Sequence, residues 1–171
     1  MFLKEIKGLG DADYTVAIDL DGVLADFDAR VKEIFNKNTS EMPTRDLWNG
    51  ISKYDKTVEP FFEYLPAMHD YKTLVNFVDN NFKEWFILTA TGNTPKNAGE
   101  QKRAWVKKVL GPQISVNTVR KSEDKAKFAT PNTILIDDRK KSIDPWIAAG
   151  GIGILHTSAV DTIKKLQHYI D

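Results

Sequence analysis

The sequence predicts an α/β protein: a doubly wound parallel sheet with one small helical cap inserted after the first strand. Short apolar, β-branched runs alternate with stretches of helical periodicity along most of the 171 residues. Such alternation is typical of right-handed β-α-β units on a mostly parallel sheet. The first run is followed by polar turns, prolines and aromatic residues, a composition that does not fit a layer of the main sheet.

The expected strands are short and buried, and they cover residues 14–18, 84–89, 114–119, 132–136 and 152–156. Apolar residues recurring every three or four positions predict helices over 28–36, 71–80, 99–110, 142–149 and 160–169. A loop and short helix are expected over 121–129, and a short amphipathic lead-in over 1–13. In the helix over 99–110 we expect Trp105, Val106, Val109 and Leu110 to face inward and lysine or arginine to face outward.

The predicted division places residues 1–27 and 76–171 in the α/β core and 28–75 in the helical cap. The cap is rich in aromatic residues and is broken by Pro43, Pro60 and Pro66. Two uses of the rings stay open, the core of a small helical bundle or the lining of a pocket over the active site. The rings concerned are Trp48, Tyr54, Phe61, Phe62, Tyr64 and Tyr71.

Composition excludes several classes of protein. The formal net charge is zero, which gives no sign of general binding to nucleic acid or to an anionic membrane. There is no cysteine, so disulfides, thiolate metal sites and cysteine nucleophiles are excluded. Charges interrupt the apolar N-terminus at once, and no apolar run approaches the ~20 residues that span a membrane. A soluble, cytoplasmic protein without a signal peptide is therefore expected.

The charge is unevenly distributed along the chain. Residues 1–70 hold 14 acidic and 8 basic residues, a balance of −6, whereas residues 96–141 hold 12 basic and 5 acidic residues, a balance of +7. A basic second half facing an acidic site would suit a small phosphorylated substrate. Solvated helix faces would account for most of the same lysines, so both interpretations stay open.

Polar residues gather where the predicted strands end. Asp19 and Asp21 follow the first strand, Thr89 ends the second, Lys125 precedes the fourth, and Asp137 and Asp138 end the fourth. The carboxyl ends of parallel strands meet at one edge, where open α/β sheets bind their ligands. Two carboxylates at alternate positions share one face, which favours a hard cation or a pair of acid and nucleophile. Thr89 alone could be an ordinary strand-end threonine, and Lys121 and Lys127 compete with Lys125.

The order and spacing of these segments resemble the haloacid dehalogenase superfamily of phosphohydrolases. The segments are Asp-Leu-Asp-Gly-Val (19–23), Ile-Leu-Thr-Ala-Thr-Gly (87–92), Lys125, and Ile-Leu-Ile-Asp-Asp (134–138). More closely, Asp-Leu-Asp-Gly-Val-Leu-Ala-Asp-Phe (19–27) with Ile-Asp-Asp-Arg (136–139) is similar to the 5′(3′)-deoxyribonucleotidase family. The resemblance implies a Rossmann-like core of the haloacid dehalogenase type with a small helical cap.

The resemblance also implies a set of roles. Asp19 would be the nucleophile, Asp21 the general acid and base, and Thr89 and Lys125 would stabilise the transferred phosphoryl group. Mg²⁺ would be held by Asp19, by Asp137 and by the backbone carbonyl of Asp21. Asp138 is counted with these ligands through a water molecule, and the alternative that it only orients the loop or Lys125 stays open. The residues implied in substrate binding are Phe27, Arg139 and Ala90, the last at a position where serine is common in that family. A packed ring for Phe27 and a structural salt bridge for Arg139 stay open as alternatives.

The expected function is therefore Mg²⁺-dependent hydrolysis of nucleoside 5′- or 3′-monophosphates, with deoxynucleotides preferred, through an aspartyl-phosphate intermediate. The expected partner is a small phosphomonoester; no membrane or nucleic acid is expected, and a homodimer stays open. One alternative is a phosphatase for another small phosphorylated metabolite or for a nucleic-acid end. Another is a non-catalytic binding module on the same fold, which the retained Asp19, Asp21 and Asp137 argue against.

Overall fold

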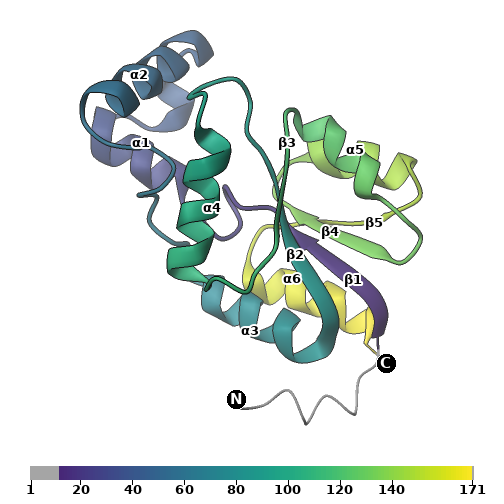
Figure 1. Cartoon of the computed structure of the whole chain (residues 1–171). Coiled ribbons are helices and arrows are strands. Elements are labelled where there is room, and N and C mark those ends of the chain that lie inside the picture. Colours follow the sequence, from purple (N-terminus) through teal and green to yellow (C-terminus); the bar gives the residue numbers. More distant parts are fainter. Residues whose placement is uncertain (1–11, 171) are drawn as a thin grey trace.

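The computed structural model describes residues 12–170, so most of the expected lead-in over 1–13 lies outside the described residues. Five parallel strands form one sheet in the order β3-β2-β1-β4-β5 (Figure 1). They are β1 (Ala12–Ile18), β2 (Phe82–Ala90), β3 (Val116–Val119), β4 (Thr133–Asp137) and β5 (Ile152–Leu155). The predicted α/β fold with a parallel, doubly wound sheet is confirmed.

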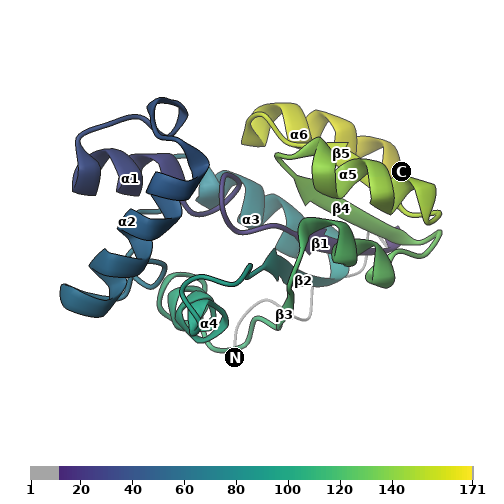
Figure 2. The same ribbon diagram turned by 90° about the horizontal axis from the view of Figure 1, so that it is seen from above.

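Both faces of the sheet are buried. Successive side chains of a strand point to opposite faces, so neighbouring residues of β1 belong to different apolar clusters. Val16 and Ile18 of β1 belong to a cluster with apolar residues of α3 (Tyr71–Asn81), α4 (Ala98–Val109) and α6 (Ala159–Leu166). Ala17, between them, belongs to the cluster on the opposite face with residues of α5 (Lys140–Ala148) and the short helix η3 (Ser122–Phe128). Helices therefore cover both faces (Figure 2).

The strand order reverses at β1. The chain passes from β1 through β2 to β3 on one side, and β4 and β5 lie on the other side of β1. In open α/β sheets this switch point leaves a crevice at the carboxyl ends of the strands. Asp19 directly follows β1 and Asp137 is the last residue of β4, so both lie at the mouth of that crevice.

An insertion leaves the core after β1 and returns before α3. It contains α1 (Phe27–Phe35), η2 (Thr39–Glu41) and α2 (Thr44–Thr57), which stand together beside the carboxyl ends of the strands (Figures 1 and 2). Its two ends are paired at Ala25 and Ala67. Backbone bonds of 2.7 Å from Asp26 to Pro66 and 2.8 Å from Met68 to Leu24 flank that pair.

The predicted cap boundary at residue 75 falls inside α3, which packs on α6 and β2 of the core. We propose that the insertion comprises residues 26–66, between the paired Ala25 and Ala67, and that α3 belongs to the core.

Helix α4 fastens the insertion to the core through Gln101. The Gln101 side chain is buried; its Oε1 accepts a bond of 2.8 Å from the Phe62 backbone, and its Nε2 donates one of 2.7 Å to Asp55. One turn further on, the indole of Trp105 donates to the Leu65 carbonyl at 2.7 Å. A buried amide that satisfies both of its polar atoms in this way fixes the relative position of the segments it joins.

The predicted strands and helices within residues 12–170 all exist, and most of their ends are shifted by one or two residues. The last helix, predicted to end at residue 169, is α6 to Leu166 and continues as the short helix η4 (Gln167–Tyr169). The third strand begins at Val116 instead of residue 114, and α5 begins at Lys140 instead of residue 142. No helix among residues 12–170 is long and apolar enough to cross a membrane.

Candidate active site

The turn after β1 brings Asp19 and Asp21 to the carboxyl edge of the sheet. The Leu20 carbonyl accepts bonds from the backbone amides of Leu24 and Ala25, both at 2.9 Å. Gly22 adopts φ +82°, a conformation that side chains rarely tolerate, and a Cβ there would collide with the Asp138 carboxylate. The last acid of the motif, Asp26, has a structural role, since its side chain caps α1 by accepting from the Ala29 amide at 2.9 Å.

Three carboxylates converge beside one buried ammonium group. Each of Asp19, Asp137 and Asp138 offers an oxygen atom within 4.8 Å of the other two. Lys125 is 2% exposed, and its Nζ lies 2.7 Å from Asp19 Oδ1 and 2.6 Å from Asp137 Oδ2. The structure therefore brings the predicted Lys125 into the acidic site, whereas its competitor Lys127 is exposed and pairs with Asp124 at 3.3 Å.

The crowding of like charges shifts the pKa values of this cluster. Burial and the negative charge of Asp19 raise the pKa of Asp137 despite its contact with Lys125. Burial of the Asp138 carboxylate, followed by the charges of Asp19 and Asp137, raises the pKa of Asp138 to about 7, although the residue as a whole is exposed. Burial lowers the pKa of Lys125, but the charges of Asp19 and Asp137 outweigh it and the net pKa is raised. The cluster thus carries more negative charge than one ammonium neutralises.

A second buried lysine, Lys102 of α4, lies on the other side of the site. Its Nζ is 2.7 Å from Asp21 Oδ2, 2.7 Å from the Ala90 carbonyl and 3.1 Å from Thr89 Oγ1. The prediction that the lysines of this helix face outward is wrong for Lys102, which is 2% exposed. Its place in the helical repeat was a usable signal, because position 102 lies three and four residues before the inward-facing Trp105 and Val106.

Lys102 fixes one half of the Asp21 carboxylate and leaves the other half free. Asp21 Oδ1 is buried and has no hydrogen-bond partner among the described residues. Burial raises the pKa of Asp21, the attraction of Lys102 lowers it, and repulsion by Asp19 raises it, with a net upward shift. A carboxyl group with a raised pKa and one free oxygen suits proton transfer to a bound ligand.

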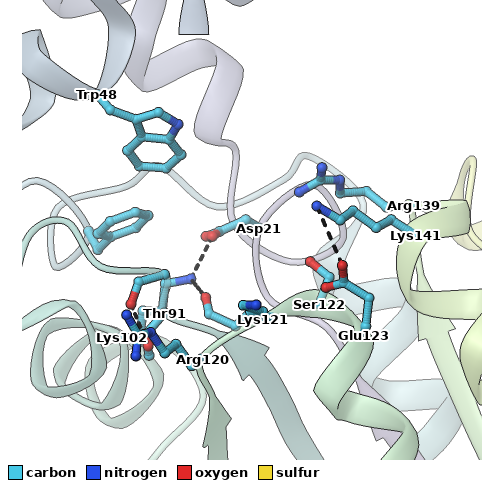
Figure 3. A pocket seen from close by; sticks show the side chains of 13 residues that line it. Asp21, Trp48, Thr91, Lys102, Arg120, Lys121, Ser122, Glu123, Arg139 and Lys141 are labelled. Carbon is cyan, nitrogen blue, oxygen red and sulfur yellow. Dashed lines mark hydrogen bonds and ion pairs between the residues drawn. The ribbon is translucent and has the colours of Figure 1, made fainter. Parts of the chain in front are cut away.

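A cavity of about 400 Å³ opens beside Asp21 (Figure 3). In the figure Trp48 of α2 lies on one side and Arg139 and Lys141, at the start of α5, on another. Two rings of the insertion, five cations and two acids contribute to its lining. The lining residues are Asp21, Trp48, Phe62, Ala90, Thr91, Gly92, Lys102, Arg120, Lys121, Ser122, Glu123, Arg139 and Lys141.

Of the three residues implied in substrate binding, Ala90 and Arg139 line this cavity and Phe27 does not. The Phe27 ring lies 6.0 Å from that of Trp48 and 6.2 Å from that of Phe62, between centroids, so it packs against the two rings that line the cavity. Nothing in the sequence around Trp48 distinguishes it, as a residue that lines the cavity, from the other rings of the insertion. Thr89, Lys125 and Asp137 are buried and do not line the cavity.

The fold is shared with hydrolases of the haloacid dehalogenase type. A hydrolase from Streptococcus pneumoniae TIGR4 superposes with a TM-score of 0.56 at 18% identity, over 90% of this chain and 98% of that chain. A hydrolase from Pseudomonas syringae gives 0.55 at 14% identity, over 92% and 100% of the two chains. A haloacid dehalogenase family enzyme from Bacteroides thetaiotaomicron, in complex with magnesium and inorganic phosphate, gives 0.50 at 14% identity, over 85% and 94%.

These likenesses establish the Rossmann-like, haloacid dehalogenase-type fold of the chain. No protein-family model matches the sequence, and no curated protein is significantly similar to it.

Proposed function

We propose that the protein is a Mg²⁺-dependent phosphomonoesterase that hydrolyses nucleoside monophosphates, deoxynucleotides in preference to ribonucleotides. One observation carries the proposal: Asp19, Asp137 and Asp138 converge around Lys125, while Asp21 stands beside them with one free oxygen. Phosphoryl transfer requires mainly positioning and charge stabilisation, which this arrangement supplies. The magnesium and phosphate bound to the fold neighbour from Bacteroides thetaiotaomicron agree with this chemistry.

The acidic cluster fits a magnesium ion. Its donors are carboxylate oxygens, which Mg²⁺ prefers. Burial and then the negative charge of Asp19 raise the pKa values of Asp137 and Asp138, and a cation would offset that charge. The Asp21 carbonyl accepts no hydrogen bond from the rest of residues 12–170, so it is available as the predicted fourth ligand. When bound, the ion would neutralise the substrate phosphate and lower the repulsion between it and the carboxylates.

In the first step, a carboxylate oxygen of Asp19 attacks the phosphorus atom and the bond to the leaving oxygen breaks. Asp19 Oδ1 is held by Lys125, whereas Oδ2 has no hydrogen-bond partner within the described part of the chain. Asp21 gives its proton to the leaving oxygen, and its raised pKa favours the protonated form that this requires. Thr89 Oγ1 accepts from Lys102, which leaves its own hydrogen free to donate to a phosphoryl oxygen.

In the second step, the Asp21 carboxylate removes a proton from a water molecule, which attacks the phosphorus of the aspartyl phosphate. Inorganic phosphate leaves, the Asp19 carboxylate is regenerated, and Asp21 is again protonated. Lys102 keeps Asp21 in one place through both steps with its 2.7 Å contact. Lys125 keeps a positive charge beside Asp19 in both states of that residue.

The nucleotide preference is supported by the ring at the cavity wall. Trp48 is 37% exposed and lines the cavity, so its face is available to a base. Stacking of a base on an aromatic ring contributes about 1–3 kcal/mol. The expected preference for deoxynucleotides comes from the resemblance of residues 19–27 and 136–139 to the deoxyribonucleotidase family. Even an apolar pocket rejects an added hydroxyl only about 10²-fold, so we expect a preference and not exclusivity.

Replacing Asp137 by alanine should abolish phosphatase activity because the magnesium site loses a buried carboxylate. Ligand binding stabilises a folded protein in proportion to the logarithm of ligand concentration, so Mg²⁺ should raise the melting temperature of the unmodified protein. The Asp137→Ala variant should show no such rise. Nucleoside monophosphate hydrolysis and thermal unfolding would be measured with Mg²⁺ and with a chelator.

The matched control is Asp144→Asn, which changes an exposed carboxylate of the neighbouring helix α5. It should respond to Mg²⁺ as the unmodified protein does. Full activity of Asp137→Ala at high Mg²⁺ concentration would contradict the ligand assignment. A panel of sugar and alkyl phosphates, together with a phosphorylated oligonucleotide, would reveal any other substrate.

Replacing Trp48 by alanine should raise KM for a deoxynucleoside monophosphate by about 10-fold or more, since a stacking surface is lost. The kcat/KM for β-glycerol phosphate, which has no base, should change little. Steady-state kinetics on the two substrates make the comparison, with Phe27→Ala as the companion variant. Equal losses on both substrates in Trp48→Ala would remove the support for a nucleotide substrate.

A further inference from the structure

The lining of the cavity is basic overall. Five basic residues line the cavity against two acidic ones, a balance of +3. Two of the basic groups are already engaged, since Lys102 pairs with Asp21 at 2.7 Å and Lys141 lies 3.8 Å from Glu123. The remaining three are Arg120, Lys121 and Arg139, which we call the basic wall of the cavity.

No carboxylate within residues 12–170 lies within 4 Å of the charged atoms of these three side chains. Arg120 is nevertheless held in place, because its Nε donates to Asn93 Oδ1 at 2.7 Å. That bond uses one of the five donors of the guanidinium group and leaves the others for a ligand. Arg120 therefore presents a fixed fork of donors of the type that binds phosphate.

The scissile phosphate does not account for this wall. That phosphate must lie against Asp19, where Lys125 and the proposed magnesium ion supply the positive charge. Lys125 does not line the cavity, whereas Arg120 and Lys121, between β3 and η3, do. The cation-binding cluster of Asp19, Asp137 and Asp138 thus lies outside the lining of the cavity, whereas the basic wall and Trp48 belong to that lining.

We propose that the substrate carries a second phosphate, bound by Arg120 and Lys121, in addition to the phosphate that is hydrolysed. The proposal rests on the proposed function and specifies its substrate as a nucleoside bisphosphate, with phosphates on both the 3′ and the 5′ oxygen. A cavity of about 400 Å³ is the size of one small ligand, which favours a single nucleotide over a nucleic-acid strand.

The test compares the binding of two ligands that differ by one phosphate. A deoxynucleoside 5′-monophosphate and the corresponding 3′,5′-bisphosphate are titrated calorimetrically, in the presence of Mg²⁺, into the Asp19→Asn variant, which lacks the nucleophile and does not consume them. The bisphosphate should bind about 3- to 30-fold more tightly, the range for two partly exposed charge contacts. Added salt should reduce this ratio because the contacts are screened.

Introducing Arg120→Gln and Lys121→Gln together should bring the ratio close to one. The matched control is Lys107→Gln with Lys164→Gln, which removes the same charge from exposed positions on α4 and α6 and should keep the ratio. Equal binding of the two nucleotides without these substitutions, an equal loss of the ratio in both double variants, or no binding of either ligand would overturn the proposal. Tighter binding of a 5′-phosphorylated tetranucleotide would overturn it in favour of a nucleic-acid end.

Failure of the proposed function is read separately, from hydrolysis by the unmodified enzyme. Preferential binding of the bisphosphate without hydrolysis of any nucleotide would support the second phosphate site and contradict the proposed phosphatase activity. Hydrolysis of monophosphates without preferential binding of the bisphosphate would support the phosphatase activity and contradict the second phosphate site.

Discussion

Replacing Asp19 by asparagine should leave a folded protein whose phosphatase activity is at least about 10⁴-fold lower, the order of loss when a nucleophile is removed. An amide oxygen cannot form a stable acyl phosphate, so the first step has no route. Asp19 is buried and one of its oxygens contacts Lys125, but Lys125 keeps Asp137 as a partner at 2.6 Å. The measurements are kcat with a nucleoside monophosphate and the far-ultraviolet circular dichroism of the variant.

The control for Asp19→Asn is Asp26→Asn in the same motif. Asparagine caps a helix about as well as aspartate, so α1 and the activity should both be retained. Quenching the unmodified enzyme with acid during turnover should also trap phosphate on Asp19. Hydrolysis by Asp19→Asn at the unmodified rate would show that water attacks the substrate directly.

Replacing Asp21 by asparagine should lower the rate on nucleoside monophosphates by about 10²–10⁴-fold, the usual contribution of acid-base assistance. Lys102 would still contact Thr89 and the Ala90 carbonyl, so the geometry around the site should persist. The loss in the first step should be much smaller for p-nitrophenyl phosphate, whose leaving group departs without a proton. The burst of nitrophenol measures that step apart from the hydrolysis of the intermediate.

An equal loss in the first step for both leaving groups would contradict a general-acid role for Asp21. The comparison variant is Asp28→Asn, which changes another carboxylate of the same segment; this one accepts from Thr39 at 2.6 Å, outside the cavity. Its rates on both substrates should match those of the unmodified enzyme.

The parallel α/β sheet and the convergence of Asp19, Thr89, Lys125 and Asp137 could be predicted because they depend on local pattern and on the geometry of parallel sheets. Strand periodicity locates the carboxyl ends, and the sheet then brings them together. The boundary of the insertion was harder to place, because α3 continues the helical character of the insertion while packing on α6 of the core.

The burial of Lys102 could not be predicted from the sequence pattern alone. Its position in the helical repeat points inward, but its charge normally points a side chain to solvent. Asp21, the Ala90 carbonyl and the Phe62 ring, 4.6 Å from its Nζ, offset that cost, and these groups come from three different parts of the chain. Likewise, the local sequence does not show whether Phe27 or Trp48 is the packed ring. The packing of the insertion determines which of the two rings lines the cavity.

Gln101 has a consequence for how ligands are selected. Because the buried Gln101 amide of α4 holds both Asp55 and the Phe62 backbone of the insertion, we expect the spacing between Trp48 and the basic wall to change little when a ligand binds. A rigid site of this kind loses little conformational entropy when it binds, and it cannot widen to admit a longer molecule. The length of the substrate would therefore be selected for, in addition to its charge and its aromatic base. Release of inorganic phosphate would not require the insertion to move away from the core.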